Sequence, residues 1–75
     1  MTTERMHFGA VIARLRRQNH LTQTQLGELL NVSSKAISKW ETGAGYPEVT
    51  LLPKIAAVFH VSIDYLFAKE DSSPE

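Results

Sequence analysis

The apolar positions of this 75-residue chain recur every three or four residues, and this spacing predicts helices. Five helical segments are expected, and no segment alternates in the manner of a strand. The first helix runs from about residue 6 to 18 and places Phe8, Ile12 and Leu15 on one face. It ends at Asn19 and His20, residue types that tolerate the left-handed conformation found at many helix ends. The pattern therefore predicts a small all-α protein.

The next two predicted helices are short and lie close together in the sequence. Thr22 is expected to cap the second helix, because Thr22 and Gln25 have the spacing of a capping box. Asn31 tolerates positive φ and ends that helix, and Ser33 is expected to cap a third helix over about 33–41. These two helices, joined by a tight turn, indicate a helix-turn-helix. Their expected inward-facing residues are apolar or small: Leu26, Gly27, Leu29, Leu30, Ala36, Ile37 and Trp40.

The rest of the chain predicts a loop over 43–47 and two further helices. The fourth is expected to begin near Thr50, with Pro53 in its first turn, and to end at His60. Ser62 is expected to cap the fifth. A domain is thus predicted over 1–68, and 69–75 is expected to be an acidic tail or the start of a linker. The expected core residues from these helices are Leu51, Leu52, Ile55, Ala56, Val58, Phe59, Ile63, Leu66 and Phe67.

Composition adds the electrostatic character of the domain. The formal net charge is zero, but residues 1–40 carry a net charge of +4 and residues 41–75 carry −4. Such a molecule can present one basic face to phosphate. The chain has no cysteine, which excludes disulfides and thiolate metal sites and fits a reducing cytoplasm. Its apolar runs are too short to span a membrane, so no membrane association is expected.

The outward face of the third predicted helix carries the candidate chemistry, and its residues are Ser34, Lys35, Ser38 and Lys39. Small hydroxyl side chains let a helix sit deep in the major groove of DNA, and the two lysines lie four residues apart on one face. Lysine suits the O6 and N7 acceptors of guanine, so a half-site that contains guanine is expected. The alternative is that these four side chains form an ordinary solvated helix face.

Several sequence pieces together resemble a known family. They are Phe8-Gly9 with Ile12 and Leu15, then the stretches 21–26, 32–33 and 37–41, Gly43, Tyr46-Pro47 and the stretch 61–66. The chain resembles the phage-repressor or Cro-type helix-turn-helix regulators, also called the xenobiotic-response-element family, of bacteria and phages. The resemblance implies a compact five-helix lambda-repressor-like domain that binds double-stranded DNA sequence-specifically. Such a protein would be a transcriptional regulator, most simply a repressor, and would act in the cytoplasm on the DNA of the nucleoid. The resemblance also implies that the protein binds an inverted-repeat operator and forms a homodimer, at least on DNA.

The resemblance also implies residue roles. Ser34, Lys35, Ser38 and Lys39 would contact bases. In such proteins the position of Gln23 binds a phosphate. The residues that contact the DNA backbone would be Thr22, Gln23, Ser33, Thr42 and Gly43. For Thr22 and Ser33 the positive N-terminal end of a helix supports a contact with phosphate. Arg16 and Glu41 would form an ion pair. The remaining structural positions are Leu26, Ile37 and Trp40. One departure is Ala44, which stands where a basic residue often follows the loop glycine.

Two other functional classes are weighed against this prediction. The same fold could serve as an antitoxin-like or other protein-interaction module with a protein partner. An enzyme is not expected, because His7, His20 and His60 have no ligand spacing and no serine lies beside a base. No cofactor or metal is therefore expected. For a dimer contact, the apolar candidates are Tyr65, Leu66 and Phe67 with the end of the first helix, although burial in the core is favoured for Leu66 and Phe67.

Overall fold

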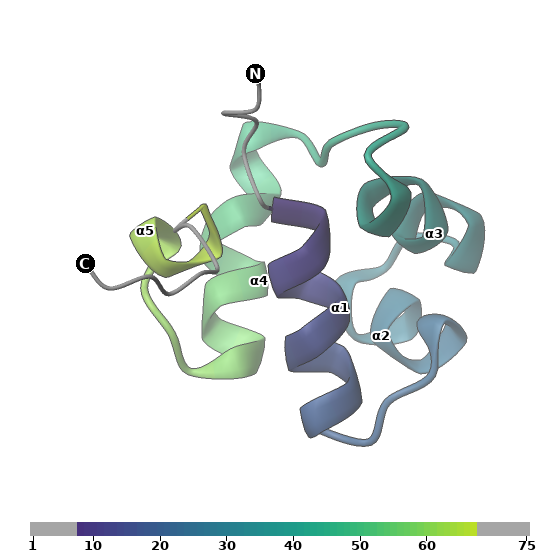
Figure 1. The fold of residues 1–75 in the computed structure, drawn as a ribbon, viewed down its shortest axis with the longest axis horizontal. Coiled ribbons are helices and arrows are strands. Elements are labelled where there is room, and N and C mark those ends of the chain that lie inside the picture. The colour runs from purple at the N-terminus through teal and green to yellow at the C-terminus, as the bar shows by residue number, and fades with distance from the viewer. Residues whose placement is uncertain (1–7, 68–75) are drawn as a thin grey trace.

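The computed structural model describes residues 8–67, and every regular element within that range is helical (Figure 1). The elements are α1 (Phe8–Gln18), α2 (Gln23–Leu30), α3 (Ser34–Thr42), a 3-10 turn η1 (Val49–Leu51), α4 (Leu52–Phe59) and α5 (Ile63–Leu66). The prediction of an all-α domain with five helices is confirmed. The expected helix start near residue 6, His7 and the tail 69–75 lie outside the described residues.

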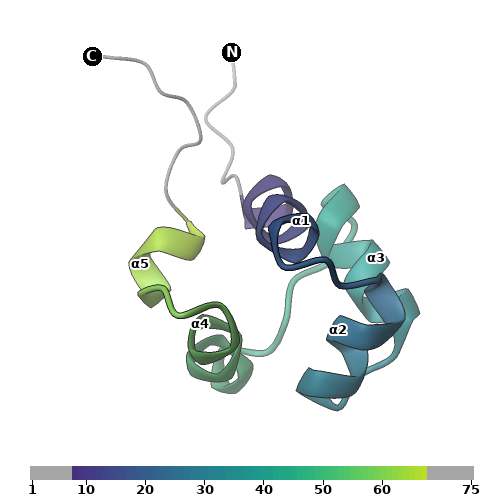
Figure 2. The ribbon, with the colours of Figure 1, turned by 90° about the horizontal axis from the view of Figure 1, so that it is seen from below.

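Helix α1 occupies the middle of the domain. In Figure 1, α2 and α3 lie on one side of it and α4 and α5 on the other, and the end-on view of Figure 2 shows the same division. A Cβ atom added at Gly9 would lie 2.5 Å from the carbonyl oxygen of Trp40 and 2.8 Å from that of Glu41. The first turn of α1 therefore packs directly on the backbone at the end of α3. A glycine within a helical pattern is the sequence signal for such an approach.

Three of the turns between helices share one construction. His20, Asn31 and His60 adopt left-handed conformations with φ of 59°, 63° and 58°. The sequence indicated this conformation at His20 and Asn31, and at His60 it predicted the helix end. In each turn the next residue donates its N–H back into the preceding helix, from Leu21 to Arg16 (3.0 Å), from Val32 to Gly27 (2.8 Å) and from Val61 to Ala56 (3.0 Å). These bonds close the helix ends in the manner of a Schellman motif.

In each of these turns, the residue that follows the apolar Leu21, Val32 or Val61 caps the next helix. Thr22 accepts from the N–H of Gln25, and the Gln25 side chain accepts from the N–H of Thr22, so the predicted capping box is present. Ser33 and Ser62 accept from the third residue of α3 and α5. Short runs of a left-handed residue, an apolar residue and a hydroxyl cap thus fix where each helix ends and the next begins.

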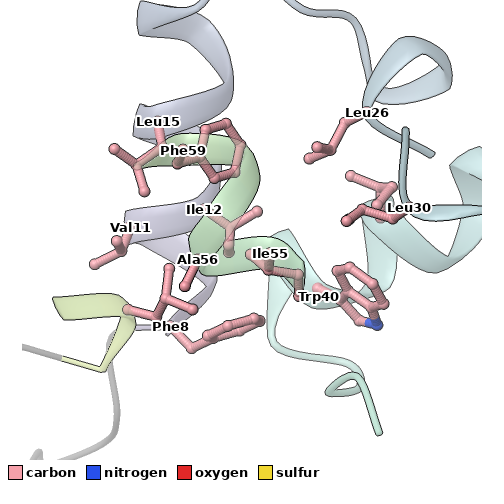
Figure 3. Packing of buried hydrophobic residues seen from close by; sticks show 12 residues of the cluster. Phe8, Val11, Ile12, Leu15, Leu26, Leu30, Trp40, Ile55, Ala56 and Phe59 are labelled. Carbon is pink, nitrogen blue, oxygen red and sulfur yellow. The ribbon is translucent and has the colours of Figure 1, made fainter. Parts of the chain in front are cut away.

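One core fills the space between the five helices (Figure 3). Its residues are Phe8, Val11, Ile12, Leu15, Leu26, Leu30, Ile37, Trp40, Ile55, Ala56, Phe59 and Leu66. Leu51, Leu52, Val58 and Phe67 are only partly buried and pack against it. The prediction that Leu29 belongs to the buried stripe of α2 is wrong, because Leu29 is 50% exposed. Helix α2 rests on its Leu26–Gly27–Leu30 side, since glycine there lets the turn carbonyl of Val32 approach closely.

The C-terminal part of the fold differs from expectation in two details. Ile63 is 40% exposed rather than buried, because α5 has a single turn and only Leu66 at its end reaches the core. The ring of Phe67 stacks on Phe8 at a centroid distance of 5.1 Å. Helix α4 begins at Leu52, two residues later than expected, because η1 precedes it, and Pro53 lies in its first turn as predicted.

Candidate nucleic-acid interface

Helix α3 separates two kinds of side chain. Ile37 is fully buried and Trp40 is 4% exposed, so these two attach the helix to the core. On the other face Ser34, Lys35 and Lys39 are exposed and Ser38 is half-buried, and this set of four is called the outer face. Neither lysine has an ion-pair partner among the described residues. The predicted base-contacting residues therefore share one accessible face of a firmly packed helix.

The turn between α2 and α3 is held by the backbone at Gly27. A Cβ atom at this position would lie 2.6 Å from the Val32 carbonyl oxygen, so the turn presses directly on α2. The sequence analysis expected Gly27 to face inward, and the structure shows that the carbonyl of the following turn packs on it. This contact fixes the angle at which α3 leaves α2.

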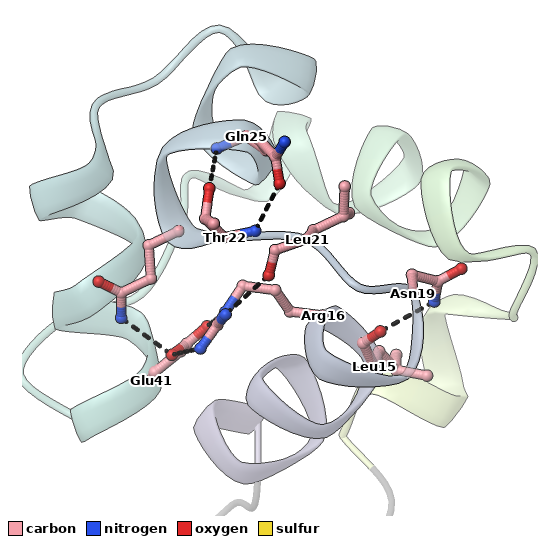
Figure 4. Close-up of polar contacts among 8 residues, drawn as sticks. Leu15, Arg16, Asn19, Leu21, Thr22, Gln25 and Glu41 are labelled. Atoms are coloured by element: carbon pink, nitrogen blue, oxygen red, sulfur yellow. Dashed lines mark hydrogen bonds and ion pairs between the residues drawn. The ribbon is translucent and has the colours of Figure 1, made fainter.

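A polar cluster joins the other end of α3 to α1 and α2 (Figure 4). The Arg16 guanidinium donates from Nε to Glu41 Oε2 at 2.6 Å and from Nη2 to Oε1 at 3.2 Å. Its Nη1 donates to the carbonyl oxygen of Leu21 at 2.8 Å, and the Gln23 amide donates to Glu41 Oε1 at 3.1 Å. The side chains of Arg16 and Glu41 are only 13% and 7% exposed. The Arg16–Glu41 pair inferred from the family resemblance is thus present.

The electrostatics of this cluster favour the charged pair. The hydrogen bond to Glu41 raises the pKa of Arg16, burial opposes that rise, and the attraction between the two charges adds to it. Arg16 therefore stays protonated at all physiological pH values, and it neutralises a carboxylate at the end of α3. Without Arg16, this carboxylate would repel a phosphate that approaches the start of α2.

The start of α2 presents hydrogen-bond donors beside that cluster. Thr22 is exposed and Gln23 is half-buried. The Thr22 hydroxyl accepts from Gln25, so its own hydrogen is left to donate. The backbone N–H groups of Gln23 and Thr24 lie in the first helical turn and point along the axis, where a helix favours an anion. Ser33, exposed at the start of α3, likewise accepts from Ala36 and can donate outward.

The residues that end α3 have their donors already engaged. The Thr42 hydroxyl donates to the Lys39 carbonyl oxygen at 3.2 Å. The Gly43 N–H is donated to the Lys39 and Trp40 carbonyls, and the Ala44 and Gly45 N–H groups also turn to Lys39. Gly43 has a φ of 85°, which glycine adopts without strain. Its contribution visible in the structure is to terminate the helix.

Sequence reasoning missed two features of this region. The Gln23–Glu41 hydrogen bond joins residues 18 positions apart, and no local pattern marks such a contact. The approach of Gly9 to the end of α3 had a signal, since glycine interrupts the α1 pattern, but the sequence did not identify its neighbour. Both features help to place α3, and neither is on its outer face.

Other kinds of site find little support in the described residues. Between residues 8 and 67 no three His, Cys, Asp or Glu side chains gather as metal ligands would. None of the described helices is both long and apolar enough to cross a membrane. Of the apolar candidates for a dimer contact, Leu66 is fully buried and Phe67 is half-buried against Phe8, whereas Tyr65 is 40% exposed.

Comparison with known proteins shows which family shares this sequence and arrangement of helices. A helix-turn-helix family model matches residues 12–66. The transcriptional activator BcrR of Enterococcus faecalis is 47% identical over 66 residues, a match that covers 88% of this chain and 32% of BcrR. The chain thus spans about a third of the length of that curated relative.

Solved structures show the same arrangement of helices. The P22 c2 repressor in complex with a synthetic operator matches with a TM-score of 0.78 and 30% identity, over 84% of this chain and 96% of that one. Hydroxypropylphosphonic acid epoxidase from S. wedmorenis matches with a TM-score of 0.76 and 28% identity, but over only 36% of its length. The fold alone therefore does not determine function. From the family model and the relatives together, the chain belongs to the helix-turn-helix family of the Cro and phage-repressor type, whose matched members include transcriptional regulators.

Proposed function

We propose that this chain is the DNA-binding domain of a transcriptional regulator and that α3 enters the major groove of double-stranded DNA as its recognition helix. The observation that carries the proposal is the division of α3. Its inner face is buried and its end is anchored by the Arg16–Glu41 pair, while the four polar residues of the outer face remain accessible. The structural neighbour P22 c2 is a repressor solved with its operator, which supports the same use of the fold here.

The outer face would read the bases. Lys35 and Lys39 lie four residues apart, so both can point into one groove and donate to the O6 and N7 atoms of guanine. Ser34 and Ser38 would add short hydrogen bonds that several bases accept. We therefore propose a half-site that contains guanine, with each correct lysine contact discriminating by about 1–3 kcal/mol.

Phosphates on one side of the groove would bind at the start of α2. The Thr22 hydroxyl, the Gln23 side chain and the free N–H groups of the first turn converge there, and Arg16 removes the repulsion from Glu41. Ser33 would donate to a phosphate from the start of α3. The proposed contact of Thr42 requires that its hydroxyl rotate away from the Lys39 carbonyl oxygen. Gly43 would act through the conformation of the loop, because its N–H is already bonded to carbonyl groups of α3.

The regulator is proposed to act as a homodimer on an inverted repeat. Recognition helices of two-fold dimers bind half-sites about one helical turn, roughly 34 Å, apart. Where such an operator overlaps a promoter, a bound dimer blocks access to it, so repression is the simplest outcome. The matched relative BcrR is named an activator, and an operator beside the promoter would give that result instead. No catalytic step is proposed for the chain.

The test is selection of binding sites from a random duplex library with the purified chain at near-physiological salt. Enrichment of an inverted repeat with guanine in each half is expected, and the double variant Lys35→Ala/Lys39→Ala should lose it while keeping its helical circular dichroism. The slope of log affinity against log salt should fall by about 0.9 for each phosphate contact. Absence of enrichment with folded protein would reject DNA recognition and favour the antitoxin-like or other protein-interaction module.

A further inference from the structure

The loop over residues 43–48 lies beside the outer face of α3. In Figure 1 it leaves the end of α3 and runs along the upper edge of the view toward α4. The N–H groups of Ala44 and Gly45 donate to the Lys39 carbonyl oxygen at 2.8 Å and 3.3 Å. A Cβ atom added at Gly45 would lie 3.8 Å from the Cβ atom of Lys39. A duplex that contacts the Lys39 side chain would therefore pass close to this loop.

The same loop has few groups that could hold a phosphate. The N–H groups of Gly43, Ala44 and Gly45 are all donated to carbonyl oxygens of α3. Residues 43–49 contain no lysine or arginine, and their only side-chain donor is the neutral hydroxyl of Tyr46. The start of α2 is different, because free N–H groups of a first helical turn and two polar side chains converge there. The two ends of the candidate interface are thus unequal in their capacity to bind the DNA backbone.

Instead of a cation, the loop carries an acidic side chain. Glu48 is exposed and forms no ion pair with another residue of the described range. It lines a depression of about 550 Å³ beside Trp40 and Tyr46. Lys54 lines the same depression, but the two side chains are not ion-paired. No salt bridge within residues 8–67 therefore neutralises the Glu48 carboxylate.

The position of Glu48 brings its charge toward the DNA backbone rather than toward the bases. The major groove is about 12 Å wide and an α-helix with its side chains about 10–12 Å, so residues beside a groove-bound helix face the sugar-phosphate strands. Glu48 follows Gly45 by three residues, so their Cα atoms lie at most about 11 Å apart. Exposed charges act over about 8 Å at physiological ionic strength. The strand that passes the end of α3 is the part of a duplex that this carboxylate would meet.

Other acids of the domain are accounted for in different ways. The Glu41 carboxylate is neutralised by Arg16. Asp64 lies in the first turn of α5, where a helix favours a negative charge, and Figures 1 and 2 show α5 on the opposite side of α1 from α3. Glu48 occupies the N-cap position of η1, yet its side chain makes no capping hydrogen bond. Its charge therefore has no visible role in holding the fold together.

We propose that Glu48 sets the strength of DNA binding by repelling the backbone strand that passes the end of α3. Phosphate contacts carry no sequence information, so this repulsion lowers the affinity for every duplex by the same factor. The domain then occupies only those sites at which both Lys35 and Lys39 find their bases. The inference deepens the proposed function and rests on it, because repulsion of phosphate matters only to a chain that binds DNA.

The test measures the affinity of the full chain for two duplexes, the selected site and an unrelated sequence, by fluorescence anisotropy at several salt concentrations. Glu48→Lys should raise both affinities by the same factor. It should also steepen the slope of log affinity against log salt by about 0.9, so that the gain is about threefold larger at 50 mM than at 200 mM salt. Glu48→Gln should raise both affinities by a smaller factor.

The matched control is Asp64→Lys, which changes the net charge by the same amount on the side of the domain away from α3. It should leave both affinities nearly unchanged at near-physiological salt, because its distance from the duplex exceeds the screening length. Circular dichroism should show the same helical content in all variants. The control separates the position of Glu48 from the overall charge of the protein.

Four outcomes decide the inference. Equal gains from Glu48→Lys and Asp64→Lys would overturn it, since net charge would then explain the effect, and a gain confined to the selected duplex would also overturn it. If the wild type binds its selected site and neither Glu48 variant changes the affinity, the inference fails and the proposed function stands. If folded wild type and folded Glu48→Lys both fail to bind either duplex, the proposed function fails with it.

Discussion

The two faces of α3 are built on different physical principles. The inner face, with Ile37 and Trp40, is closed by apolar packing, the Gly9 approach and the Arg16–Glu41 pair. The outer face has two lysines with no ion-pair partner in the described structure and two serines. Substitutions on the inner side should therefore change the stability of the fold, and substitutions on the outer side should change binding alone. The difference teaches that this helix is attached to the core by one side, which leaves the other side free for the recognition role proposed above.

The largest expected effect is the loss of Arg16. Arg16→Ala would leave the Glu41 carboxylate mostly buried without its partner, and removal of one member of such a pair costs about 3–5 kcal/mol of unfolding free energy. Urea unfolding followed by circular dichroism measures this change. Arg17→Ala, at the neighbouring exposed position, is the control and should change stability by less than about 0.5 kcal/mol. Equal effects of the two variants would show that the pair does not anchor α3.

A smaller effect is expected where α1 approaches α3. Gly9→Ala places a methyl group against the backbone carbonyls of Trp40 and Glu41, which cannot turn aside as a side chain can, so α3 must shift at a cost of about 1–3 kcal/mol. Gly45→Ala is the matched control, because its added Cβ would meet its nearest neighbour, Lys39 Cβ, only at 3.8 Å. Thermal unfolding of both variants gives the comparison. A stabilised Gly9→Ala protein would mean that α1 and α3 are not in close contact in solution.

The outer face should give the opposite result. The double variant Lys35→Ala/Lys39→Ala is expected to change the unfolding free energy by less than about 0.5 kcal/mol, since both side chains are exposed and neither forms an ion pair within residues 8–67. Its affinity for the selected site should nevertheless fall, and the guanine preference in each half should disappear. Fluorescence anisotropy with matched and mismatched duplexes measures this. Retained discrimination by the variant would remove the two lysines from base recognition.

The smallest effect concerns pH. The pKa of Arg16 is raised in the folded state, so its contribution to stability is fully present below the unfolded value and is lost only as the pH rises through the folded one. Both values lie in the strongly alkaline range. The stability difference between the wild type and Arg16→Ala should thus stay constant from neutral to mildly alkaline pH in parallel denaturant titrations. A difference that shrinks within this interval would contradict the charged pair.

Much of the local structure follows from the sequence because it depends on neighbouring residues. The capping box at Thr22, the serine caps, the left-handed positions at His20 and Asn31 and the helix end at His60 are all short-range features, and all were predicted. Leu29 and Ile63 were not placed correctly. Helical spacing shows which residues share a face, but only packing decides which part of a broad apolar face is covered.

The candidate interface also combines features that local sequence predicts with features that only packing determines. The outer face of α3 could be named from spacing, since residues 34, 35, 38 and 39 lie together on any helix that buries Ile37 and Trp40. The Arg16–Glu41 pair needed the family resemblance, because 25 residues separate the partners. The Gln23–Glu41 bond and the depression beside Trp40 were visible only in the structure.

The sequence by itself determined the helices, their caps, the residues on the outer face of α3 and the family. Each of these depends on interactions within a few residues or on a pattern repeated along the chain. The tertiary structure alone decided that α1 rests on the end of α3 at Gly9, that Arg16 of α1 binds both Glu41 of α3 and the turn before α2, and that Trp40 and Tyr46 line one depression. These contacts join residues distant in sequence, so they arise only when all the helices pack around one core.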